Sequence, residues 1–172
     1  MAIRTIITEP NKLLRQISKP VKGVGKEEQK LMDDMLETMY DANGIGLAAI
    51  QVGVPKRIIV MDISKDDNKK EPRYFINPVI KNKDQLKATY EEGCLSVPNQ
   101  FAEIDRPSKC EVEYLDYDGG KKLLKADGLL ATCIQHEMDH LEGILFIDYL
   151  SKLKRSMIIK KLSKKKSSAA IL

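Results

Sequence analysis

The chain contains two histidines, His136 and His140, and they lie four residues apart in CIQHEMDHLEG (133–143). Residues i and i+4 of an α-helix share one face and lie about 6 Å apart along the axis, so two imidazoles at this spacing can bind one metal ion. Glu137 follows the first histidine, where a carboxylate lies close to the ion and can act as a base toward water. The spacing therefore predicts a metal site on a helix.

A catalytic site of this kind takes three protein ligands and leaves one coordination position open. Since the chain has no further histidine, the third ligand must be Cys, Asp or Glu. Cys94, in EEGCLSVP (91–98), follows a glycine at the end of an expected strand, where backbone can closely approach another element. Cys110 and Cys133 compete for this role, and any free cysteine can equally be a small buried apolar side chain. Spacing alone therefore leaves Cys94 as one candidate of three.

Small and apolar residues surround Gln51 in NGIGLAAIQVGVP (43–55). An amide in this setting is expected to be buried, and a buried amide needs hydrogen-bond partners. The Gln51 side chain either satisfies neighbouring backbone or donates to an oxygen of a substrate. A nucleotide site is not indicated, because no phosphate-loop Lys and no ribose-binding acid follow the glycines at the usual distance.

Length and composition indicate one globular domain, residues 1–172, with 42% hydrophobic and 31% charged residues. No apolar run is long enough to cross a membrane, and the charged N-terminal stretch does not resemble an export signal. Three cysteines cannot all pair, which favours a reducing compartment. We therefore expect a cytoplasmic protein that binds neither membrane nor DNA.

The hydrophobic patterns predict an α+β fold with mainly antiparallel sheets around a central HExxH metal-binding helix, N-terminal helices and a C-terminal helix. Helices are expected over 10–17, 26–40, about 129–141 and about 149–162. Strands are expected over 57–63, 74–80, 85–93 and 109–119. The last helix has one apolar face, formed by Leu150, Leu153, Met157, Ile158 and Leu162.

The C-terminal helix and tail, from about residue 149, are strongly basic. Eight Lys or Arg and no acidic residue follow Asp148. The other 21 basic and 25 acidic residues give residues 1–148 a net charge of −4. A polyanionic partner would therefore bind the tail rather than the body of the protein.

Three motifs, GIGLAAIQ (44–51), EGCLS (92–96) and QHEMDHLEG (135–143), together resemble the three motifs of the peptide deformylase family in order and spacing. The resemblance implies a metal-dependent hydrolase that removes the formyl group from N-formylmethionine of nascent polypeptides. It also implies a ribosome partner, because some similar bacterial enzymes bind the ribosome through a C-terminal helix.

For the metal site, the resemblance implies that Cys94, His136 and His140 are ligands and that Glu137 is the general acid/base. The implied cofactor is one divalent ion, with Fe²⁺ as the native metal and Zn²⁺, Ni²⁺ or Co²⁺ as alternatives in preparations. The ligand chemistry alone suits zinc and ferrous iron alike.

For the substrate, the resemblance implies an oxyanion hole made by the Gln51 amide and the backbone N–H of Leu95. The backbone of Gly46 would help to hold the peptide. Ile45, Leu129 and Cys133 would line an apolar pocket for the methionine side chain, or belong to the core. Many bacterial relatives carry an Arg shortly after the second motif, where this chain has Phe101, so we expect no Arg contact there.

Arg106 is the next basic residue, and we expect it to pair with Glu92 and support the metal site. Three other functions compete with deformylation. A zinc endopeptidase also uses HExxH, but no downstream acidic or His ligand is evident. An RNA-binding module would use the basic tail, but clustered aromatic residues are missing. A structural Cys/His₂ site would need a fourth protein ligand.

Overall fold

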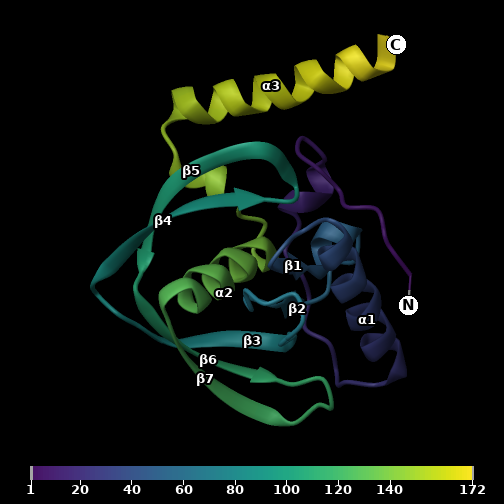
Figure 1. The fold of residues 1–172 in the computed structure, drawn as a ribbon, viewed down its shortest axis with the longest axis vertical. Coiled ribbons are helices and arrows are strands. Elements are labelled where there is room, and N and C mark those ends of the chain that lie inside the picture. Colours follow the sequence, from purple (N-terminus) through teal and green to yellow (C-terminus); the bar gives the residue numbers. More distant parts are fainter. Residues whose placement is uncertain (1, 172) are drawn as a thin grey trace.

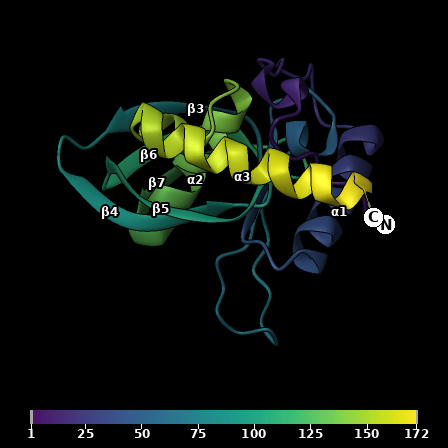
Figure 2. The same cartoon turned by 90° about the horizontal axis from the view of Figure 1, so that it is seen from above.

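The computed structural model describes the backbone of residues 2–171 and the side chains of residues 2–164. One helix, α2 (Gly128–Leu141), lies between two antiparallel sheets, with α1 (Lys26–Asp41) at one side and α3 (Lys152–Ile171) across the outside (Figures 1 and 2). The larger sheet has the order β1-β2-β3-β6-β7, formed by Gly46–Ala48, Ile58–Met61, Arg73–Lys83, Lys109–Leu115 and Lys121–Asp127. The smaller sheet pairs β4 (Lys87–Cys94) with β5 (Val97–Pro107). Three 3₁₀ turns complete the described part of the chain: η1 (Lys12–Arg15), η2 (Ala49–Val52) and η3 (Phe146–Tyr149).

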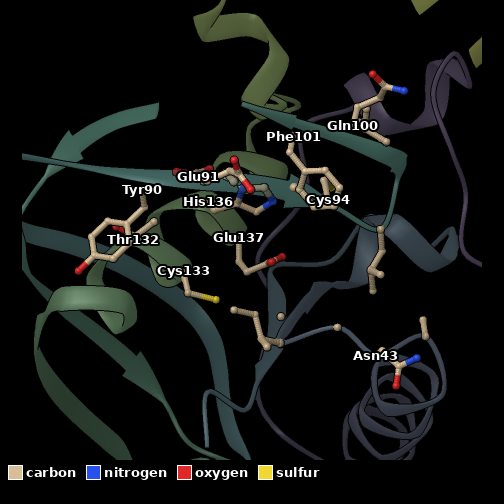
Figure 3. Close-up of a pocket in the computed structure, with 18 of the residues that line it drawn as sticks. Asn43, Tyr90, Glu91, Cys94, Gln100, Phe101, Thr132, Cys133, His136 and Glu137 are labelled. Carbon is tan, nitrogen blue, oxygen red and sulfur yellow. Dashed lines mark hydrogen bonds and ion pairs between the residues drawn. The ribbon is translucent and has the colours of Figure 1, made fainter. Parts of the chain in front are cut away.

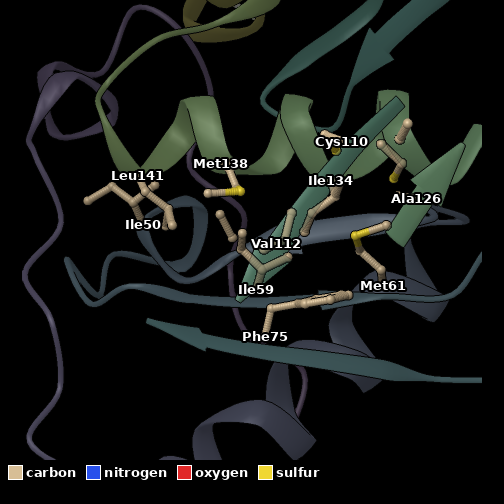
Figure 4. Packing of buried hydrophobic residues seen from close by; sticks show 13 residues of the cluster. Ile50, Ile59, Met61, Phe75, Cys110, Val112, Ala126, Ile134, Met138 and Leu141 are labelled. Carbon is tan, nitrogen blue, oxygen red and sulfur yellow. The ribbon is translucent and has the colours of Figure 1, made fainter. Parts of the chain in front are cut away.

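Most of α2 is buried, and its buried residues include polar side chains, Thr132, Gln135, His136, Glu137 and His140, as well as apolar ones. Figure 4 shows Ile134, Met138 and Leu141 of α2 above Ile59 and Phe75 of the larger sheet. The opposite side of α2 faces the β4–β5 hairpin (Figure 1). The histidines of this helix are therefore enclosed from two directions, and a metal site there is sheltered from bulk water.

The helix α1 packs against β1 and β2 through the apolar rows expected from its four-residue spacing. Leu31, Met35 and Met39 are all buried in this contact. The helix ends near Asn43, whose φ of 57° lies in the left-handed region. The chain then enters β1, so α1 and its end determine where the first motif lies.

Several predicted elements differ from the structure. Residues 10–17 form only the short 3₁₀ turn η1 instead of a helix. Neither β5 nor β7 was predicted, because their residues are mostly polar or half-exposed and lack a strong apolar alternation. The strand expected over 74–80 continues to Lys83. These strands are specified by pairing with a neighbouring strand rather than by their own composition.

The last helix begins at Lys152 rather than at residue 149, which ends η3. The apolar face expected on this helix packs on the core only in part. Leu162 is buried and Ile158 packs against the same cluster, but Leu153 and Met157 are 72% and 51% exposed. The helix contacts a narrow hairpin, which covers only part of its surface (Figure 2).

Within residues 2–171, none of the helices combines the length and the apolar character needed to cross a membrane.

Candidate active site

The two histidines of α2 and Cys94 at the end of β4 converge on one point. One ligand atom from each of Cys94, His136 and His140 lies within 4.8 Å of the other two. The Cys94 Sγ and His140 Nε2 atoms are 3.4 Å apart. Cys110 lies in the core beneath α2 and takes no part in this cluster. Of the three cysteines, the tertiary structure brings Cys94 to the histidines.

Glu92 and Arg106 orient the first histidine. His136 Nδ1 lies 2.8 Å from Glu92 Oε1, and Arg106 binds both oxygens of Glu92 at 2.7 and 3.0 Å. Burial raises the pKa of Glu92, but these two partners outweigh burial and hold the pKa below its ordinary value. An ionised Glu92 accepts a hydrogen bond from the Nδ1–H group of His136, which leaves Nε2 free for a metal ion. The predicted pairing of Arg106 with Glu92 is confirmed.

The hydrogen bonds that hold Arg106 beside Glu92 continue through Asp139 to Tyr149, at the start of the C-terminal region. Arg106 also donates to Asp139 at 2.8 Å, and the Tyr149 hydroxyl donates to the same Asp139 oxygen at 2.7 Å. The Arg106 guanidinium lies 5.0 Å from the centre of the Tyr149 ring. The buried cation is thus paired with two carboxylates and covered by an aromatic ring, which offsets the cost of its burial.

The donor set fits a divalent transition metal. One thiol and two imidazoles suit zinc or ferrous iron, and burial lowers the pKa of His140 well below its ordinary value, which favours the neutral imidazole. Burial lowers the pKa of His136 too, but Cys94 and Glu92 outweigh it and raise the value. A cation at His136 Nε2 would replace the proton that these two neighbours favour.

Glu137 lies beside this cluster, pointing toward the open space in Figure 3. Its side chain is buried, and Oε2 has no hydrogen-bond partner among the described residues. Burial raises the pKa of Glu137 to about 7, although the positive charges of His136 and Arg106 lower it in part. A buried carboxylate oxygen without a protein partner, next to a candidate metal site, is suited to exchange protons with a bound molecule.

Gln51 is buried in η2, as expected, and its amide is held at both ends. Its Oε1 accepts from the backbone N–H of Ala48 at 2.9 Å. Its Nε2 donates to Ser96 Oγ at 3.0 Å and lies 3.6 Å from Cys94 Sγ. The amide therefore satisfies local backbone and also directs an N–H group toward the candidate metal site.

A cavity of about 490 Å³ opens beside these groups. Its lining includes the residues expected to bind substrate: Ile45, Gly46, Gln51, Leu95, Leu129 and Cys133. The sequence did not indicate Tyr90, Pro98 or Thr132, which also line it. Tyr90 and Pro98 lie within a few residues of the second motif, and this proximity is the signal that could have identified them.

Phe101, where no Arg contact was expected, lies at the rim of the cavity. Its side chain is 66% exposed, and its ring lies so close to Gly93 that a Cβ there would come within 2.6 Å of it. The rim therefore carries an aromatic ring beside the ligand-bearing strand rather than a cation (Figure 3).

The model of the polypeptide deformylase family matches residues 3–156 of this chain. The chain belongs to this family. It is 78% identical, over the full length of both chains, to the peptide deformylase of Pelagibacter ubique (strain HTCC1062). The crystal structure of a peptide deformylase from Ehrlichia chaffeensis is 45% identical and has a TM-score of 0.91, covering 96% of this chain and 97% of that one. A peptide deformylase structure from Legionella pneumophila is also 45% identical, with a TM-score of 0.90 and 98% coverage of both chains.

The deformylase family confirms the function expected from the three motifs. The chain is a metal-dependent hydrolase that removes the formyl group from N-formylmethionine of nascent polypeptides. The α+β class is confirmed as well. The alternative of a zinc endopeptidase is not favoured.

Proposed function

We propose that residues 1–172 form a single catalytic domain in which Cys94, His136 and His140 hold one divalent metal ion. The convergence of their ligand atoms within 4.8 Å is the observation that carries this proposal. When bound, such an ion activates water and polarises a carbonyl group. We propose Fe²⁺ as the native ion, with Zn²⁺, Ni²⁺ or Co²⁺ able to take its place.

Glu137 moves the proton. Its unpartnered Oε2 accepts a proton from the attacking water, and the same carboxyl group then delivers that proton to the nitrogen of methionine as the C–N bond breaks. The products are formate and a peptide with a free amino group. A pKa near 7 suits a group that must first accept a proton and then donate it.

Gln51 and Leu95 stabilise the charge that forms on the formyl oxygen during attack. The Gln51 Nε2 group lies 3.6 Å from Cys94 Sγ, so its remaining N–H faces the reacting centre. Leu95 follows Cys94 in the turn between β4 and β5 and lines the same cavity, so its backbone N–H would be the second donor. Hydrogen-bond donors that are fixed in advance need no reorganisation during the reaction.

The remaining cavity residues hold the substrate. The backbone of Gly46 lies beside Glu137 and would bind the peptide next to the formyl group. Ile45 and Leu129 are partly exposed to the cavity, and Cys133 adds a buried sulfur. Together these three side chains form an apolar surface that suits methionine. Phe101 at the rim leaves this chain without an Arg contact to the peptide backbone at that position.

We also propose that the protein works in the cytoplasm and binds the ribosome through α3. The supporting observation is the charge of the helix, where Lys152, Lys154, Lys160, Lys161 and Lys164 are exposed. The side chains of Lys165 and Lys166, two of the eight basic residues that follow Asp148, lie outside the described residues. RNA phosphates are the polyanion that such a surface fits.

One experiment tests the catalytic proposal directly. The protein is purified without oxygen, its metal content is measured, and the same sample is assayed on a formyl-Met peptide and on the N-acetylated peptide of the same sequence. We expect about one metal ion per chain and release of formate from the first peptide alone. A metal-free preparation with full activity would contradict the proposal.

A further inference from the structure

Ser96 is a buried polar residue in the second motif to which the proposed mechanism gives no role. It is fully buried, in the turn that joins β4 to β5, two residues after Cys94. Its hydroxyl oxygen accepts a hydrogen bond of 3.0 Å from Gln51 Nε2. The side chain is thus in direct contact with the group that we assign to the oxyanion hole.

The contacts of the Gln51 amide determine which way it faces. Because the Ala48 N–H donates to Oε1 at 2.9 Å, the other end of the amide must be the NH₂ group. That group has two hydrogens. Ser96 Oγ accepts one of them, and the other is left on the side of Cys94 Sγ, at an Nε2–Sγ distance of 3.6 Å. Ala48 restrains the amide at Oε1, and Ser96 adds a restraint at the NH₂ end that limits rotation of the amide plane about its last torsion.

The N-terminal segment binds the backbones of both partners. The Ile7 N–H donates to the backbone carbonyl of Gln51 at 2.7 Å, and the Glu9 N–H donates to the carbonyl of Ser96 at 2.8 Å. Residues 7–9 therefore join η2 to the β4–β5 turn. Gln51 and Ser96, which meet there, are 45 residues apart in the sequence. This connection restrains the two backbone segments that carry the Ser96 hydroxyl and the Gln51 amide.

We propose that Ser96 is a positioning residue for the reaction: its hydroxyl holds the Gln51 amide so that one N–H faces the formyl oxygen as charge develops there. This inference rests on the proposed role of Gln51. It assigns Ser96 a kinetic role in addition to its part in packing the turn. Orientation of a donor affects the transition state more than it affects ground-state binding, so kcat should be more sensitive than KM.

The test is a double-mutant cycle with Ser96→Ala and Gln51→Leu, measured on a formyl-Met peptide with metal content and Tm as controls. We expect Gln51→Leu to lower kcat on the order of 10²-fold or more. Ser96→Ala should lower kcat about 10-fold or more, with KM and metal content near their original values. In the Gln51→Leu background, Ser96→Ala should change kcat less than about twofold, because no donor is left to position.

A matched pair separates the hydroxyl from packing. Ser96→Thr and Ser96→Val add similar volume, but only threonine keeps an oxygen that can accept from Gln51. We expect the threonine variant to be at least about 10-fold faster than the valine variant. Equal kcat values for this pair would overturn the proposal. If the added methyl group prevents folding, Ser96→Ala alone decides, and an unchanged kcat overturns the proposal.

The cycle also separates this inference from the function on which it rests. An unchanged kcat for folded Gln51→Leu would remove Gln51 from the oxyanion hole and the Ser96 proposal with it. A slow Gln51→Leu variant, combined with an equal effect of Ser96→Ala in both backgrounds, would keep the role of Gln51 and overturn that of Ser96.

Discussion

Gly46 leaves the space that the Glu137 carboxyl group occupies. A Cβ atom built on Gly46 would lie 2.6 Å from Glu137 Oε1 and 3.0 Å from its Cδ and Cγ atoms. Real Cβ atoms do not approach other heavy atoms this closely, so any side chain at Gly46 must displace Glu137. A strand residue of the first motif thus limits the position of the proposed acid/base in the third motif.

The variant Gly46→Ala should therefore lower kcat about 10²-fold, because a displacement near 1 Å is enough to misplace a catalytic group. Metal content should stay the same, since none of the three proposed ligands contacts Gly46. Gly23→Ala is the matched control, because a Cβ at Gly23 meets nothing within 4 Å. Equal kcat values for the two variants would show that Glu137 tolerates the shift.

Glu137→Gln should keep the metal ion and lose activity on the order of 10²–10⁴-fold. Glutamine has a similar shape but cannot accept and deliver a proton. Metal analysis and kcat/KM on a formyl-Met peptide check both halves of this expectation. Loss of the metal, or activity close to that of the original protein, would remove Glu137 from the proposed role.

Cys94→Ser should weaken metal binding far more than Cys110→Ser or Cys133→Ser. Only the Cys94 sulfur lies with the two histidines, whereas Cys110 packs in the core cluster. The measurement is metal stoichiometry after dialysis against a weak chelator. Cys133→Ser is the stricter control, because Cys133 lines the same cavity. Equal retention of metal in all three variants would contradict the ligand assignment.

Arg106→Lys should lower metal affinity about 10–100-fold, although it keeps the positive charge. Lysine cannot bind both oxygens of Glu92 and also reach Asp139, as Arg106 does over 2.7–3.0 Å. The orientation of His136 then depends on a weaker contact with Glu92. Competition with a chelator measures the affinity. Arg73→Lys, in a half-exposed strand position, is the control and should have no effect.

Replacing Lys160, Lys161, Lys164, Lys165 and Lys166 by Glu should weaken ribosome binding without changing kcat on short peptides. Phosphate contacts release counterions, so binding of the original protein should also fall steeply with salt. The control makes the same change of charge at five exposed lysines outside α3: Lys22, Lys65, Lys69, Lys121 and Lys122. Sedimentation with ribosomes at low salt measures how much of each variant binds. Equal binding by the two variants would show that α3 has no special part.

The sequence determined those features that depend on a local repeat. The four-residue spacing of His136 and His140 predicts their common face wherever the helix lies, and α2 carries them as expected. The apolar rows at four-residue spacing predicted helix α1 correctly for the same reason. The order of the three motifs was sufficient to predict the family, and the match to the family model confirms that prediction.

Only the tertiary structure decided which groups meet across the chain. The selection of Cys94 over Cys110, and the contact of Ser96 with Gln51, depend on how the β4–β5 turn folds over α2. Leu153 and Met157 are exposed because the hairpin beneath α3 is narrow, although they continue the apolar pattern of the helix. Periodicity describes the faces of one element, whereas ligand geometry and burial depend on the neighbour that each face meets.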